Sequence, residues 1–185
     1  MKNKKPELYF SIDIEADGPI PGQNSMLSLG CAAITREGNI LDTWECNFLE
    51  LPGAIQDPKT MEFWAKNPVA WENARKNPRD PNFICSFASW VSSYKDYKHV
   101  VVGYPIAYDF MFVYWYLIKF NKSSPFSHSG IDIKTLAMSK LNCPYKEASK
   151  KNMPKEWFYG AKHTHVAVDD AIEQARLFIN ILNSK

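Results

Sequence analysis

The stretch Tyr9-Phe10-Ser11-Ile12-Asp13-Ile14-Glu15 decides which fold this sequence adopts. Successive side chains of a β-strand point to opposite faces, so the apolar residues share one face while Asp13 and Glu15 share the other. Two carboxylates side by side on a strand that looks central repel each other unless a cation or a proton lies between them. The alternative is an edge strand with a solvated acidic face, and the pair alone does not decide between the two.

Outward from this stretch, the alternation of apolar and polar residues predicts the remaining elements. Further strands are predicted over 25–35 and 40–49, antiparallel to each other, over 100–103, and at a sheet edge over 131–133. Helices are predicted from Pro58, over 83–94, over 107–120 and over 168–183. Three strands followed by alternating helices and strands predict an α/β fold, with helices packed on one mixed sheet.

Length and composition predict one globular domain over residues 1–185, with a core from about 8 to 182. Hydrophobic residues make up 45% and charged residues 23%, which excludes a disordered or fibrous chain. The 22 basic and 20 acidic residues leave a net charge of +2. This balance excludes a polybasic tail protein but allows a locally basic groove for nucleic acid.

The sequence predicts a cytoplasmic protein with no membrane segment. The longest apolar run, 110–118, ends at Lys119 and is far shorter than the roughly 20 residues that a span requires. The basic start is followed by Pro6-Glu7 rather than by an apolar segment, unlike a signal peptide. The four cysteines include no CxxC pair, so we expect reduced, buried thiols and no cysteine-based zinc site.

Asp109 is a carboxylate in an apolar setting, because it is the only charged residue between His99 and Lys119. It lies at the start of the predicted helix over 107–120, whose faces are otherwise apolar. The helix dipole alone is one explanation, since it stabilises an acid in the first turn by about 0.3–1 kcal/mol. That explanation does not require the carboxylate to be buried.

The last helix separates two adjacent carboxylates. At 100° per residue, one polar stripe is expected to face water: Asp169, Glu173, Arg176 and Asn180. Asp170 falls outside this stripe, on the apolar side, and is therefore predicted to point inward. His165 lies just upstream, near enough to share a site with Asp170 if the helix begins between them. A histidine at such a position is, by itself, more often structural than catalytic.

Four carboxylates in unusual places suggest one metal site built from Asp13, Glu15, Asp109 and Asp170. Hard oxygen ligands without cysteine indicate Mg²⁺ or Mn²⁺ rather than zinc. Clustered acids that hold two such ions about 3.5–4 Å apart are the arrangement used for in-line phosphoryl displacement.

Three motifs resemble those of the DEDDh 3′→5′ exonuclease superfamily, which includes RNase T, oligoribonuclease and proofreading exonucleases. They are Asp13-Ile14-Glu15, then Ala107-Tyr108-Asp109, then the HxAxxDA pattern over 165–171, which is the most specific of the three. The resemblance runs from Leu8 to about Leu182. It implies an RNase H-like fold, with a five-stranded mixed β-sheet flanked by α-helices and the first strand carrying the acidic pair.

The resemblance also implies roles for these residues. Asp13, Glu15 and Asp170 would hold the nucleophile-side metal, Asp13 would bridge to a second ion, and Asp109 would reach that ion through water. His165 would be the general base, with His163 as a competitor that the motif spacing disfavours. The implied activity is a metal-dependent 3′→5′ exonuclease, using two Mg²⁺ or Mn²⁺ ions, on single-stranded RNA or DNA with a free 3′ end. The products would be nucleoside 5′-monophosphates.

Some features leave alternatives open. Many relatives have Asn where this chain has Pro105, which affects any contact made by that Asn. An inactive RNase H-like module that binds nucleic acid or associates with a polymerase is the alternative function, and an endonuclease of the same fold is another. Homodimers are frequent in the superfamily, so a homodimer is an open possibility.

Substrate contacts are expected from two segments. Residues 140–162 hold six Lys and two Glu with interleaved aromatics, a composition suited to single strands, although a solvated loop with packed aromatics would look the same. The loop over 16–22 would form the other lip of the cleft. The candidate contact residues are Ala16, Asp17, Gly18, Met26, Tyr108 and Lys162. A core role is the alternative for Met26, and it is the expected one for Trp64 and Trp71.

Overall fold

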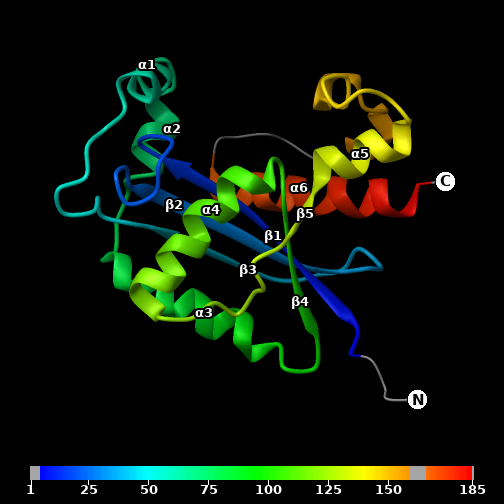
Figure 1. The fold of residues 1–185 in the computed structure, drawn as a ribbon, viewed down its shortest axis with the longest axis horizontal. Helices are drawn as coiled ribbons and strands as arrows, with labels where there is room; N and C mark the ends of the chain where they lie inside the picture. The colour runs from blue at the N-terminus through cyan, green and yellow to red at the C-terminus, as the bar shows by residue number, and fades with distance from the viewer. Residues whose placement is uncertain (1–4, 159–165, 185) are drawn as a thin grey trace.

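Strand β1 (Glu7–Ala16) lies at the centre of a five-stranded mixed sheet of order β3-β2-β1-β4-β5 (Figure 1). It pairs antiparallel with β2 (Met26–Thr35) and parallel with β4 (Lys98–Gly103). The edge strands are β3 (Ile40–Asn47) and β5 (Ile131–Asp132). This computed structural model describes residues 5–158 and 166–184. The predicted five-stranded mixed sheet with the acidic strand at its centre is therefore confirmed.

The helices cover both faces of the sheet (Figure 1). Their bounds are α1 Pro58–Lys66, α2 Pro68–Asn73, α3 Ile84–Ser93, α4 Ile106–Tyr116, α5 Ile133–Leu141 and α6 Ala167–Asn183. Helices α3 and α4 pack on one face, and α5 and α6 pack on the other. The helical pattern from Pro58 is two short helices, because Asn67 ends α1 and Pro68 begins α2.

The alternation along β1 divides the molecule into two apolar cores. Phe10, Ile12 and Ile14 pack with α3 and α4, as the sequence predicts for one face of the strand. The opposite face carries Tyr9 at its start, which contacts Phe178 of α6 at a ring distance of 4.9 Å. From Ser11 onward the same face is polar, so the core on this side stops where the carboxylates begin.

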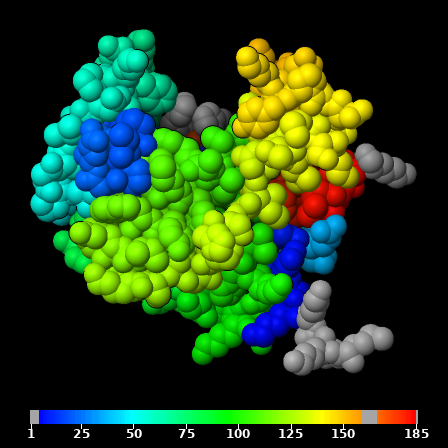
Figure 2. Space-filling model, in the orientation of Figure 1, coloured from blue at the N-terminus to red at the C-terminus, as the bar shows by residue number. Residues whose placement is uncertain are grey.

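Trp64 belongs to the packing, as predicted, and also supports the end of β1. Its side chain is buried, and its indole Nε1 donates a hydrogen bond to the Ala16 carbonyl at 3.0 Å. Trp71 lies beside it, with the ring centroids 5.3 Å apart. Figure 2 shows that the surface is hollowed between α1 and α2 on one side and α5 with its following segment on the other.

The four cysteines are free thiols, and none of the helices within 5–158 and 166–184 is long and apolar enough to cross a bilayer.

Candidate active site

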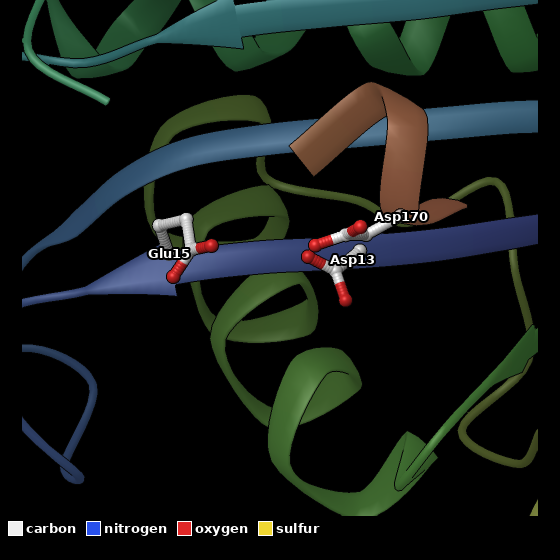
Figure 3. Close-up of side chains that lie close together, drawn as sticks. All are labelled: Asp13, Glu15 and Asp170. Atoms are coloured by element: carbon white, nitrogen blue, oxygen red, sulfur yellow. The ribbon is translucent and has the colours of Figure 1, made fainter. Parts of the chain in front are cut away.

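Asp13, Glu15 and Asp170 bring their carboxylates together above β1. One oxygen of each lies within 4.8 Å of the others, although Asp13 and Asp170 are about 157 positions apart in the chain. Figure 3 shows the Asp170 side chain meeting Asp13 from the first turn of α6, with Glu15 two residues further along the strand. Asp170 is 1% exposed, which confirms that it points inward.

Gly30 allows α6 to come close enough for this contact. It pairs with Asp13 across the β1–β2 ladder. A Cβ atom at position 30 would lie 2.1 Å from the Ala167 carbonyl carbon, so any side chain there would overlap the backbone of α6. The first turn of α6 therefore rests directly on β2, one strand away from Asp13.

Asp109 lies in the first turn of α4, on the other side of β1, and is 4% exposed. Its helix is anchored by Asp132, whose carboxylate accepts the Ile106 N–H at 3.2 Å and also caps α5 through the Thr135 N–H at 2.7 Å. Among the described residues, the Asp109 Oδ2 atom has no hydrogen-bond partner. A buried carboxylate oxygen without a partner is costly, so this atom has the chemistry to accept a group from outside the described residues.

The four carboxylates act on one another electrostatically. Burial, followed by the charges of Asp109, Glu15 and Asp170, raises the pKa of Asp13 well above its ordinary value. Burial and the charges of Asp170 and Asp109 raise the pKa of Glu15 to about 8. Burial raises the pKa of Asp109 to about 7 against the opposing effect of a backbone hydrogen bond with Ile14. A site in which negative charges disfavour one another has affinity for a cation.

The residues present therefore fit a hard divalent ion. Asp13, Glu15 and Asp170 supply a converging set of carboxylate oxygens. Asp109, whose charge acts on Asp13, supplies an oxygen that has no hydrogen-bond partner among residues 5–158 and 166–184. Oxygen ligands of this kind suit Mg²⁺ or Mn²⁺.

Gln174 contacts this cluster and was not predicted from the sequence, whereas Lys150, a lysine of the predicted basic segment, acts on the cluster electrostatically. The Gln174 side-chain amide, 2% exposed, donates to Asp13 Oδ1 at 2.6 Å and so fixes that carboxylate. The charge of Lys150 opposes the rise in the pKa of Asp13. Gln174 lies four residues after Asp170, one turn along the same face of α6. The sequence signal for Gln174 is its spacing, because a polar residue four positions after an inward-pointing carboxylate of a helix also points inward.

The prediction that Glu173 faces water is wrong. Its side chain is 6% exposed and pairs with Lys150 at 3.0 Å, because the segment after α5 folds over this part of α6. Asn180 in the same predicted stripe is partly covered and donates to the Trp157 carbonyl at 2.9 Å. Asp169 and Arg176 are exposed, as predicted.

Three predicted substrate contacts are buried inside the protein. Met26 is fully buried in the core beside Tyr116, whose hydroxyl accepts its N–H at 2.8 Å. The Asp17 carboxylate accepts the Ser25 N–H at 2.6 Å, and Ala16 is held by Trp64. These side chains shape the loop after β1 from within, and the core alternative for Met26 fits its burial. Contacts of Ala16, Asp17 and Met26 with substrate stay predictions.

Tyr108 joins this loop to α4. Its hydroxyl donates to the Gly18 carbonyl at 3.2 Å, and burial with the nearby carboxylates raises its pKa to about 12. Tyr108 is partly exposed. Its contact with substrate, and that of Gly18, stay predictions.

The Lys-rich segment is only partly what the sequence predicts. Trp157 is buried against α6, while Tyr145 is 47% exposed with the Lys134 ammonium 4.1 Å from its ring centre. The packed-aromatic alternative therefore holds for Trp157. His165, His163 and Lys162 lie outside the described residues, so the base and its competitor stay predictions.

The metal-free protein is expected to lose stability as the pH rises from about 5 to about 8. The pKa of Glu15 is raised from 4.5 to about 8 on folding, so in this interval the folded state holds a proton that the unfolded state has released. The resulting stabilisation is complete below about pH 4.5 and is lost as the pH rises through about 8. Thermal unfolding in EDTA measures it, and Glu15→Gln should flatten the dependence. A melting temperature that rises over this interval would contradict the mutual repulsion.

Comparison with known proteins places the fold. No protein-family model matches the chain. The 3′-5′ DNA exonuclease Cap18 of Escherichia coli is 27% identical over 176 residues, covering 93% of this chain and 90% of that protein. The nuclease domain of 3′hExo, a DEDDh family member bound to rAMP, has a TM-score of 0.69 at 13% identity over 96% of this chain and 92% of its own.

A second solved structure, the Mg²⁺- and Mn²⁺-bound form of S. pombe Pop2p, has a TM-score of 0.63 at 18% identity over 94% of this chain and 82% of its own. The expected RNase H-like fold is thereby confirmed. In sequence and in fold, the chain resembles the DEDDh 3′→5′ exonucleases, as its motifs predict.

Proposed function

We propose that the protein is a metal-dependent 3′→5′ exonuclease that hydrolyses single-stranded nucleic acid with a free 3′ end to nucleoside 5′-monophosphates. The observation that carries the proposal is the convergence of Asp13, Glu15 and Asp170 within 4.8 Å, with the buried Asp109 carboxylate acting on Asp13. The 3′-5′ exonuclease named among its relatives supports the same reaction.

Each carboxylate has a defined place in this proposal. Asp13, Glu15 and Asp170 would hold one divalent ion, and Asp13 with Asp109 would hold a second. When bound, such ions supply an activated water and stabilise the charge that develops on the phosphoryl oxygens. Gln174 keeps one oxygen of Asp13 fixed, so that the other is left for the ion. His165 would take the proton from the attacking water.

DNA is the substrate that we expect to be cleaved faster, since the curated relative is a DNA exonuclease. RNA is tested as well, because the solved structure of the 3′hExo nuclease domain contains bound rAMP. Recognition of the 2′-hydroxyl needs few contacts, so one site can accept either sugar to different degrees.

The test uses 5′-labelled single-stranded DNA and RNA of one sequence, incubated with Mn²⁺ or with EDTA. We expect a ladder that shortens from the 3′ end in Mn²⁺ alone, with nucleoside 5′-monophosphates identified by chromatography, and with DNA shortened faster. Intact strands under every metal tried would contradict the proposal and favour a binding-only module. Internal cleavage would favour an endonuclease.

A further inference from the structure

A groove of about 450 Å³ leads away from the carboxylate cluster toward β3. The floor of the groove is formed by three residues paired across the sheet: Glu15 of β1 pairs with Ser28 of β2, and Ser28 pairs with Asn47 of β3. Residues paired across neighbouring strands point to the same face, so the three form one row from the cluster to the sheet edge. Val166 and Ala167 at the start of α6 form one wall.

The opposite wall is the turn that follows α2, and Asn47 ties this turn to the floor. The Asn47 side-chain amide donates to the Asn73 carbonyl at 2.7 Å and to the Lys76 carbonyl at 2.9 Å. Arg79 then runs beside the end of β3, where its N–H donates to the Asn47 carbonyl at 2.8 Å. The wall is therefore held in place before any ligand binds.

This wall presents cations and amides to the groove. Lys76, Asn77 and Arg79 line it and are exposed. The Arg79 guanidinium lies 4.7 Å from the Phe83 ring centre. Burial raises the pKa of Cys46 in the groove to about 11, and the Arg79 charge opposes this rise. Glu15 of β1 and Glu45 of β3 are the acidic lining residues of the groove. The groove thus carries its positive charge on the wall after α2 and its negative charge on strands of the sheet.

The polar lining of the groove and its position between the carboxylates and the sheet edge indicate which class of ligand it binds. Ammonium, guanidinium and amide groups bind phosphate oxygens and nucleotide edges, and a phosphodiester backbone is tracked mainly by cations. The row ends at β3, an edge strand of the sheet. A polymer that continues beyond the cleaved bond needs such an exit, whereas the released mononucleotide does not.

We propose that this groove carries the strand upstream of the cleaved bond, with Lys76 and Arg79 contacting its phosphates and Asn73 and Asn77 bonding its polar edges. The proposal rests on the exonuclease function proposed above. It makes the turn after α2 the part of the protein that sets affinity for longer strands.

The test compares Lys76→Ala and Arg79→Ala with Lys98→Ala, an exposed lysine at the opposite end of the sheet, where β4 pairs with the start of β1. Hydrolysis of a single-stranded 12-mer is measured from about 50 to 200 mM NaCl. Each groove variant should raise KM roughly fivefold, as for the loss of an exposed ion pair. The slope of log KM against log salt should fall by about 0.7 per lost phosphate contact. Lys98→Ala should match the wild type.

Two further measurements separate this proposal from the exonuclease proposal. The wild-type protein is assayed on the p-nitrophenyl ester of thymidine 5′-monophosphate, which has no upstream strand, and its failure on both ester and 12-mer would overturn the exonuclease function. Binding of the labelled 12-mer in EDTA, followed by fluorescence anisotropy, measures the groove without catalysis. Groove variants with wild-type KM, affinity and salt slope would overturn the groove proposal, and so would an effect on kcat without one on KM.

Discussion

Asp170→Asn is expected to lower turnover at least about 10³-fold while leaving the protein folded. The change removes one charged oxygen from the converging set formed with Asp13 and Glu15. A bound metal ion contributes several kcal/mol to stabilising the transition state, and each 1.4 kcal/mol is a factor of ten in rate. Asparagine fills the same space, so the packing of the first turn of α6 is kept.

The same variant should be more stable than the wild type when metal is absent. Asp170 is one of the charges that raise the pKa values of Asp13 and Glu15, so its neutralisation relieves repulsion in the folded state. Asp169→Asn is the matched control, since Asp169 is its exposed neighbour. Weaker Mn²⁺ binding is expected as well. Turnover assays, calorimetry with Mn²⁺ and thermal unfolding in EDTA measure these three effects. Wild-type turnover in Asp170→Asn would refute the metal assignment.

Gly30→Val is expected to destabilise the fold by about 3 kcal/mol or more, at the upper end for an overpacked core. The new Cβ would lie 2.1 Å from the Ala167 carbonyl carbon, and backbone cannot rotate away as a flexible side chain can. For a domain of this size, such a loss lowers the melting temperature by roughly 6–12 °C. Mn²⁺ binding should weaken too, because α6 carries Asp170 and must shift away from β2.

Gly53→Ala is the control for this prediction. Gly53 has a φ of +79°, and a side-chain Cβ there would meet no non-neighbouring residue of the described ranges within 4 Å, so the change adds backbone strain without a clash. Its expected cost is about 1 kcal/mol, with Mn²⁺ binding unchanged. Equal melting temperatures for Gly30→Val and the wild type would show that α6 does not rest on Gly30 in solution.

The sequence predicts the parts of the site that depend on local periodicity. A period of two places Asp13 and Glu15 on the same face of β1, and a rotation of 100° per residue separates inward Asp170 from exposed Asp169. Asp109 stands out because its helix is otherwise apolar. These predictions hold because the direction of each side chain is set by the backbone geometry of a single strand or helix.

The errors arise where segments distant in the chain meet. Glu173 belongs to a polar stripe of an isolated helix, but Lys150 and its neighbours fold over that stripe and bury it. The groove beside Glu15 combines β2, β3 and the turn after α2, so no single stretch of sequence reveals it.

The central claim is that the carboxylate cluster removes nucleotides from a free 3′ end, and a circular substrate tests it most directly. A linear single-stranded DNA and its covalently closed circle, identical in sequence, are incubated with the protein and Mn²⁺ under the same conditions. The linear strand should be degraded to nucleoside 5′-monophosphates, while the circle stays intact because it offers no end. Opening of the circle at the rate at which the linear strand disappears would contradict the claim.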